Sequence, residues 1–328
     1  MSTNVSRLRR RVTPDAVVEL RDRLKIGKQF WRDYLQYCGS RAHKVSDGAS
    51  GVDRTVLETH LTKDYHRVEK GLALREPRRP FGRDVERRLE QNLRLALESG
   101  RAPSTEVDFE EYARQALAGL REWNDSAHRS DLLSPVVRQT YQENSSADPT
   151  SPMENFFASR ASVRDFQEKA VVDRGLIDRA AAIAQTAPSV CNRQSGRLHV
   201  FSGHDDVTRV LSNQNGNAGF RESVPHVAVI TVDRRLFSGP EERNQRWVDG
   251  GLFAMTFVWG LQAMGVATCM LNWSVKHDQD ARMRDVIRMS EHEDIVCLVA
   301  FGYRRPESRV ARSPKRPLRS VLSYDECV

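Results

Sequence analysis

The sequence predicts an α+β protein, in which an all-helical N-terminal region precedes a sheet that is covered by helices. Three observations support this prediction. Apolar residues recur at helical spacing through residues 13–143, with no convincing strand among them. From residue 197 onward, short runs rich in β-branched residues alternate with helical segments. One of those segments, residues 244–265, is apolar around most of its circumference, which is typical of a helix buried on all sides.

The N-terminal half contains four predicted helices, at residues 13–39, 52–74, 81–100 and 108–128. The first has Thr13 in the N-cap position and Pro14 at the first helical position, where a missing N–H costs nothing. Gly100 is a natural stop for the third. Residues 142–152 are polar, with two prolines, and form the best linker. We therefore expect an N-terminal helical domain of unknown role at residues 1–148 and a second domain at residues 149–328.

The C-terminal half contains four predicted strands and one dominant helix. Residues 197–203 and 226–233 are rich in β-branched residues, and residues 266–272 and 294–303 are apolar runs typical of buried strands. In the helix at residues 244–265, apolar residues such as Leu252, Phe257 and Leu261 face several directions. That helix is expected either to lie at the centre of a large domain or to pack against a second subunit.

Composition narrows the function classes. The net charge of +7 would permit nucleic-acid binding, and a helical adaptor that binds nucleic acid or anionic surfaces is one alternative. Acids and bases alternate, however, as in residues 83–98, which favours a solvated and salt-bridged surface without nucleic acid. The five cysteines form no CxxC pair, so we expect no metal site, no disulfide framework and a cytoplasmic location. The sequence has no run of about 18 apolar residues, so we expect no membrane span.

Arg160, Ser162 and Arg164 form the first candidate site. They follow a short helix and enter an extended segment, in which residues two apart point to the same side. Two guanidinium groups and a hydroxyl on one side suit the oxygens of a phosphate group. Considered alone, the same pattern also fits a polar surface strand whose arginines pair with nearby acids such as Asp165.

A second candidate site follows at residues 187–195, where Pro188 is expected to end a helix of small residues. Ser189, Asn192 and Gln194 then project hydroxyl and amide groups that can hydrogen-bond to the polar edge of a heterocycle. These residue types are also common in turns for conformational reasons. A third feature is the segment 304–319, with seven Arg and Lys residues, which could form a solvated tail or return to the phosphate.

The order of these motifs resembles the nitroreductase family of FMN-dependent oxidoreductases. The resemblance covers residues 153–322 and rests on R-x-S-x-R, A-P-S-x-x-N-x-Q, the long apolar helix ending in LQAMGVAT, and the basic C-terminal segment. It implies a nitroreductase-like three-layer α/β/α sandwich with a mixed, largely antiparallel sheet. It also implies a homodimer with FMN at the interface, in which NAD(P)H donates a hydride and an electron-poor small molecule then accepts it.

The resemblance assigns cofactor-binding roles to particular positions. It implies that Arg160, Ser162 and Arg164 contact the phosphate and the ribityl chain, and that the loop containing Pro188, Ser189, Asn192 and Gln194 runs along the pyrimidine side of the ring. It further implies that the backbone of Leu271 and Asn272 lies near the ring, and that Lys315 and Arg316 form the basic pair that closes on the phosphate. Ala161, Ser195-Gly196 and Asn272-Trp273 depart from the family pattern. Trp273 would narrow the substrate pocket or stack on a substrate.

The helical region adds a further group of candidates. His66, Glu69 and Lys70 lie at helical spacing on one side of a helix, where they could bind substrate or supply a proton. A salt-bridged helix end is the alternative. The extended form suggests a role in bacterial polysaccharide or secondary metabolism. A flavin-binding or regulatory module without catalytic activity remains the alternative function.

Overall fold

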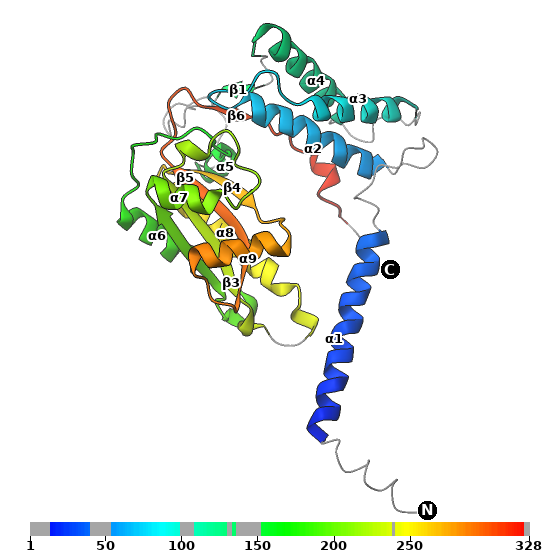
Figure 1. The fold of residues 1–328 in the computed structure, drawn as a ribbon, viewed down its shortest axis with the longest axis vertical. Coiled ribbons are helices and arrows are strands. Elements are labelled where there is room, and N and C mark those ends of the chain that lie inside the picture. The colour runs from blue at the N-terminus through cyan, green and yellow to red at the C-terminus, as the bar shows by residue number, and fades with distance from the viewer. Residues whose placement is uncertain are drawn as a thin grey trace, which may run out of the picture.

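The computed structural model describes residues 14–39, 54–98, 108–129, 133–135, 152–237 and 240–324. Figure 1 shows a helical region beside a sheet domain, with the first helix extending away from the other N-terminal helices and approaching residues 240–242 of the sheet domain. The predicted linker at residues 142–152 lies outside the described residues except at Pro152, and so does the boundary between residues 148 and 149. The division of the chain into domains at that point therefore stays a prediction.

The predicted N-terminal helices are confirmed, and they precede the sheet domain. They are α1 (Pro14–Gly39), α2 (Arg54–Leu72), α3 (Arg83–Glu98) and α4 (Phe109–Ser126). Helices α2, α3 and α4 share a core that includes Leu61, Leu89 and Leu120. Asp108 caps α4 by accepting a hydrogen bond from the backbone N–H of Glu111 at 2.9 Å, which satisfies a donor that the helix cannot.

The sheet domain is built on four strands in the order β2 (Gly196–Ser202), β3 (His226–Asp233), β5 (Glu293–Gly302) and β4 (Ala267–Asn272). Each predicted strand is confirmed within two residues, and every neighbouring pair is antiparallel. A parallel bridge between Ser162 and Thr268 adds to the outer edge of β4. The sheet is therefore mixed and largely antiparallel, as expected.

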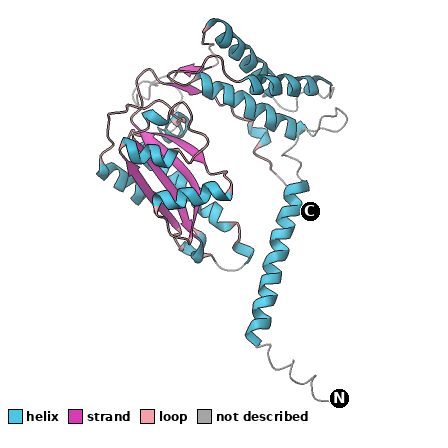
Figure 2. Cartoon of the chain, in the orientation of Figure 1, coloured by secondary structure: helices cyan, strands magenta, loops and turns pink. Residues whose placement is uncertain are grey.

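Helices cover both faces of this sheet, as the alternation of its side chains requires. Helices α7 (His204–Leu211) and α9 (His277–Ile287) lie on one face, and α6 (Arg174–Ala184) and α8 (Gln245–Ala263) on the other (Figure 1). Figure 2 shows the strands enclosed between the helical layers. In β3, Val227 and Val229 enter one core while Ala228 and Ile230 enter the other. This is the predicted three-layer α/β/α sandwich.

Smaller elements complete the described chain. Helix α5 (Pro152–Ser159) precedes the sheet domain. Short 3₁₀ turns occur at Val190–Asn192, Arg221–Ser223, Arg234–Leu236, Pro240–Glu242 and Leu318–Ser320. None of the helices in the described part of the chain combines the length and the hydropathy of a bilayer-spanning segment.

One expectation was wrong, since a strand does occur within residues 13–143. Strand β1 (Leu133–Pro135) pairs antiparallel with β6 (Arg309–Ala311), a strand within the basic segment 304–319. A three-residue strand is too short to show an alternating pattern, and its partner lies far along the chain. Both strands therefore escape detection by local periodicity.

After β6, the C-terminal segment runs along α2 in the helical region. Arg312 lies 3.7 Å from the Glu69 carboxylate, and Arg316 lies 3.4 Å from that of Glu58. Their guanidinium groups also stack over aromatic rings of α4, that of Arg312 over Tyr112 at 4.3 Å. The segment from Arg309 to Arg316 therefore ties the helical region to the sheet domain.

Candidate functional site

Two arginines and a lysine converge beside the first residues of β4. We call Arg160, Arg164 and Lys70 the cationic cluster. The segment that carries the arginines leaves α5 in extended form and is fixed to the sheet, since the Val163 N–H donates to the Thr268 carbonyl at 2.9 Å. That hydrogen bond extends the edge of β4 and places Arg160 and Arg164 beside the buried Cys269, whose thiol both charges influence.

Arg164 is the most enclosed member of the cluster. It is only 9% exposed, and its Nη1 donates to the Ser162 carbonyl at 3.3 Å. Its buried Nε has no hydrogen-bond partner among the described residues. Because a buried cation with an unsatisfied donor is costly, such a group is expected to meet an anion. The phosphate of FMN fits this requirement in both charge and hydrogen-bonding capacity.

Lys70 brings the helical region into this site. It lies in the last turn of α2, and its Nζ donates to the Gly216 carbonyl at 3.5 Å. Burial lowers the pKa of Lys70, and the positive charge of Arg164 lowers it further. Burial of Cys269 raises the pKa of its thiol, which is therefore a small buried apolar group.

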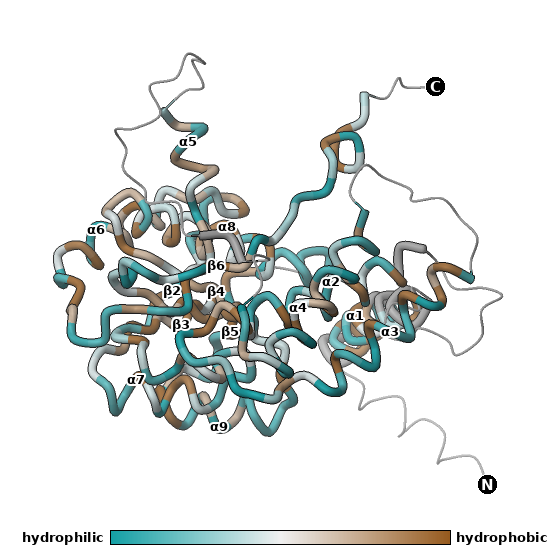
Figure 3. The backbone as a smooth tube through the Cα atoms, turned by 90° about the horizontal axis from the view of Figure 1, so that it is seen from above, coloured by the Kyte–Doolittle hydropathy of each residue, from teal (hydrophilic) through white to brown (hydrophobic). Residues whose placement is uncertain are grey.

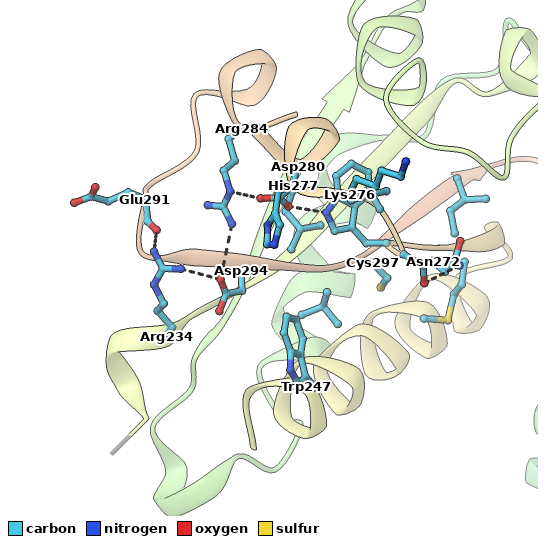
Figure 4. Close-up of a pocket in the computed structure, with 17 residues that line it drawn as sticks. Arg234, Trp247, Asn272, Lys276, His277, Asp280, Arg284, Glu291, Asp294 and Cys297 are labelled. Atoms are coloured by element: carbon cyan, nitrogen blue, oxygen red, sulfur yellow. Dashed lines mark hydrogen bonds and ion pairs between the residues drawn. The ribbon is translucent and has the colours of Figure 1, made fainter. Parts of the chain in front are cut away.

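A pocket opens at the other end of β4, with a volume of about 1080 Å³ (Figure 4). Leu271, Asn272 and Trp273 line it, together with Trp247 of α8. The Trp273 ring is held in place, because its Nε1 donates to Asp280 at 2.8 Å. The pocket and the cationic cluster lie along one strand, about 13 Å apart from Cys269 to Trp273 at the usual rise per residue.

Charged groups form the far wall of this pocket. Asp294 receives a hydrogen bond from Arg234 at 3.0 Å and lies 3.8 Å from Arg284, which also pairs with Asp280 at 2.6 Å. Figure 4 shows these side chains engaged with one another. The charges of this wall are therefore largely compensated, in contrast to those of the cationic cluster.

The amide loop, residues 187–195, lies at the start of β2. Helix α6 ends at Ala184, four residues before Pro188, so the proline follows the helix end and does not set it. Cys191, Asn192 and Gln194 have positive φ angles, and the Gln194 N–H donates to Ser189 Oγ at 3.0 Å. This tight backbone leaves the Asn192 and Gln194 side chains exposed, although they lie 3.3 Å from each other.

One chain does not bring the amide loop and the cationic cluster together. Thr268 of β4 pairs with Phe301 of β5, which in turn pairs with His226 at the first position of β3. Gly196 of β2 pairs with Val232, near the other end of β3. These positions differ by about 20 Å along the strands and about 14 Å across them. Since the sheet and its helices fill that space, one ligand can contact both groups only if a second chain supplies one of them.

The remaining sequence candidates have other partners in this chain. Glu69 is 1% exposed, close to Arg312 and to the Ser313 N–H, and His66 Nδ1 lies 3.9 Å from it. Arg316 pairs with Glu58, and the exposed Lys315 precedes it. Glu58 and Lys70 are about 18 Å apart along α2, so Arg316 does not reach the cationic cluster of its own chain.

Some residues of the site escaped sequence analysis. Gln214 donates to the Asn272 carbonyl at 3.0 Å and thereby positions the pocket backbone. Asp280 orients Trp273, and Arg75 holds α2 against the segment that contains Arg164. Only Asp280 left a local signal, since it stands four residues before Arg284 on a helix.

The model of the nitroreductase family matches residues 157–214 and 204–303. Comparison with curated proteins gives no significant match. Among solved structures, the ydfN protein of Bacillus subtilis, described as a nitroreductase, is 15% identical with a TM-score of 0.48, covering 53% of this chain and 98% of its own.

Two further solved structures are similar. An FMN-dependent nitroreductase of Clostridium difficile is 18% identical with a TM-score of 0.42, over 52% of this chain and 95% of its own. A nitroreductase family protein of Streptococcus pneumoniae is 18% identical with a TM-score of 0.46, over 53% of this chain and 100% of its own.

Proposed function

Because the model of the nitroreductase family matches residues 157–303, we propose that the chain belongs to this family and is an FMN-dependent oxidoreductase that uses NADH or NADPH to reduce an electron-poor small molecule. The family supports an oxidoreductase role in general. The cofactor, the nicotinamide and the class of acceptor are our proposal. A role in bacterial polysaccharide or secondary metabolism would fit such an acceptor.

The observation that supports this proposal most strongly is the buried Arg164, whose Nε has no hydrogen-bond partner among the described residues. Acids close to it in sequence are engaged elsewhere, since Asp165 pairs with Arg75 at 2.8 Å. The cationic cluster therefore has the charge and the free donor that a phosphate group requires. In this proposal Arg160, Ser162 and Arg164 hold the phosphate of FMN.

When bound, FMN would supply the hydride-transfer chemistry, and the protein would supply position and electrostatics. The backbone of Leu271 and Asn272 would border the ring in the pocket at the end of β4. Hydrogen bonds from Asn192 and Gln194 would stabilise negative charge on the pyrimidine side. Trp273, held by Asp280, would close one wall against water and limit the acceptor to a small or flat molecule.

We propose that the active form is a homodimer, because the amide loop and the cationic cluster of one chain lie at diagonally opposite corners of the sheet. An apolar stripe on α8 and α5 is available for the contact. It consists of the exposed Val248, Leu252 and Phe157 and the partly exposed Met255 and Trp259, and the Phe157 ring packs against that of Trp259. Leu252 is 42% exposed, so this chain alone does not bury α8 on all sides. A second copy that covered this stripe would bury it and could supply the amide loop.

We also propose residues 1–148 and 149–328 as the two domains and the cytoplasm as the location, on the sequence grounds given above. The alternative function is a flavin-binding or regulatory module without turnover. Trp273 favours that alternative, because its fixed ring occupies part of the pocket in which an acceptor would bind.

The absorbance spectrum of the purified full-length protein tests the proposal. We expect flavin absorption, either as isolated or after FMN is added, and its loss under anaerobic conditions with NADH or NADPH. A flavin-containing protein that neither nicotinamide reduces would support the binding module. A protein that binds no FMN under any of these conditions would refute the proposed function.

A further inference from the structure

Lys70 belongs to the helical region, yet its side chain reaches the sheet domain. Its Nζ donates to the Gly216 carbonyl at 3.5 Å, and it lies close enough to Arg164 and Cys269 to interact with both electrostatically. Its position in the last turn of α2 favours a cation, because the C-terminal end of a helix carries partial negative charge.

Two contacts made shortly after Lys70 in the chain fix where α2 ends. Arg75 donates to Asp165 at 2.8 Å and to Glu168 at 2.6 Å, and these acids directly follow the arginine segment. Leu74 packs closely on Gly219, since a Cβ atom added to Gly219 would lie only 2.5 Å from Leu74 Cδ1. Lys70 is therefore held beside Arg164 by the fold and does not merely sample that position.

The carboxylates next to Lys70 and Arg164 in the sequence are paired with other cations. Glu69, the preceding residue, lies 3.7 Å from Arg312, and Asp165 is held by Arg75. Three cations are thus gathered at one place while their neighbouring acids compensate other charges. Such an arrangement repels itself unless an anion joins it.

We infer that Lys70 is a third cation for the phosphate monoester that Arg160 and Arg164 bind, so that the helical region completes the cofactor site. This inference rests on the proposed function and identifies which end of FMN the helical region contacts. Arg316, which the family resemblance places at the phosphate, is paired with Glu58 on α2 in this chain. Lys70 would supply a further cation to the site in its place. The helical region is then part of the cofactor site and not only an appendage.

The test compares FMN with riboflavin, which has the same ring and no phosphate, on the full-length protein freed of bound flavin. Lys70→Met removes the charge and keeps a long apolar side chain. Lys63→Met is the matched control, since Lys63 is an exposed lysine of α2 whose Nζ lies 3.2 Å from the His60 ring. Binding is measured by quenching of flavin fluorescence.

We expect Lys70→Met to weaken FMN binding by about tenfold or more, the usual loss for one charge-assisted contact, and riboflavin binding by less than about threefold. Lys63→Met should change neither, and Lys70→Arg should retain most of the affinity for FMN. Equal FMN affinity in Lys70→Met and Lys63→Met would overturn the inference and leave the proposed function intact. A parallel loss of FMN and riboflavin would also overturn it, because that pattern reports a structural role.

Thermal unfolding without flavin gives a second readout. Since Lys70→Met relieves repulsion with Arg164, the flavin-free variant should unfold at the same or a higher temperature than the wild-type protein, while FMN should stabilise it less. A lower unfolding temperature in the absence of flavin would contradict the charge argument. Wild-type protein that binds neither flavin would refute the proposed function and the inference together.

Discussion

Replacing Arg75 with methionine should loosen the helical region from the sheet domain. Arg75 makes four hydrogen bonds across this boundary, two to Asp165 Oδ1 at 3.0 and 2.8 Å, one to Glu168 at 2.6 Å and one to the Phe166 carbonyl at 3.1 Å. The Asp165 side chain is 7% exposed, so its charge would lose its main partner within the protein.

The size of the effect follows from this burial. Removing one partner of a fully buried ion pair costs about 3–5 kcal/mol. Arg75 is 33% exposed, and Arg305 remains 3.6 Å from Asp165, so part of that cost is avoided. We therefore expect the variant to lose about 2 kcal/mol of unfolding free energy, roughly a 30-fold change in the equilibrium.

Urea denaturation of the full-length protein, followed by far-ultraviolet circular dichroism, measures this loss. If the cost arises from the unpaired Asp165 charge, adding Asp165→Asn to Arg75→Met should restore about half of it or more. The wild-type protein, the two single variants and the double variant form a double-mutant cycle, which gives the interaction energy between Arg75 and Asp165. A loss below about 0.5 kcal/mol, or no recovery in the double variant, would refute the reasoning.

Three further predictions follow from other parts of the structure. Gly250→Ala should lower the free energy of unfolding by about 1–3 kcal/mol in urea denaturation, since the new Cβ would lie 2.5 Å from Val296 Cγ2. Gly251→Ala is the control and should cost less, because nothing lies within 4 Å of its Cβ position. Equal losses in the two variants would contradict the prediction. Burial lowers the pKa of His226, so protonation favours the unfolded chain, and the free energy of unfolding should fall as the pH drops below about 6.5. The variant His226→Gln should weaken this pH dependence. If the unfolding free energy of the variant changes with pH between about 7.5 and 5.5 as steeply as that of the wild-type protein, the prediction is wrong. Leu252→Glu should give a monomer in size-exclusion chromatography and reduce FMN binding; a variant that stays dimeric would show that the stripe on α8 is not the interface.

Sequence patterns predicted the elements whose signal is local. Residues 226–233 were expected as a strand and form β3 with those bounds, because a run of β-branched residues identifies a buried strand wherever it lies. The helix at residues 244–265 corresponds to α8 for a similar reason. The exposed Leu252 shows the limit of this method, since an apolar residue does not reveal whether its own chain or a partner covers it.

Contacts between distant residues could not be predicted in this way. Nothing near Lys70 indicates that Arg164 will lie beside it, because their proximity depends on how α2 docks through Arg75 and Leu74. The pairing of Arg316 with Glu58 is equally hidden, since a lysine- and arginine-rich segment is compatible with several acidic partners. Residue types therefore suggested the kind of chemistry, while the tertiary fold decided which residues meet.

The strand pair β1–β6 has a consequence for a chain that is cut. A single break between residues 135 and 152 would leave β1 on one fragment and β6 on the other, joined by their backbone hydrogen bonds. Ion pairs would also hold the two fragments together, namely those of Arg75 with Asp165, of Arg312 with Glu69 and of Arg316 with Glu58. A nicked molecule should therefore migrate as one particle until denaturant is added, and the two halves should reassociate when they are mixed after separate refolding.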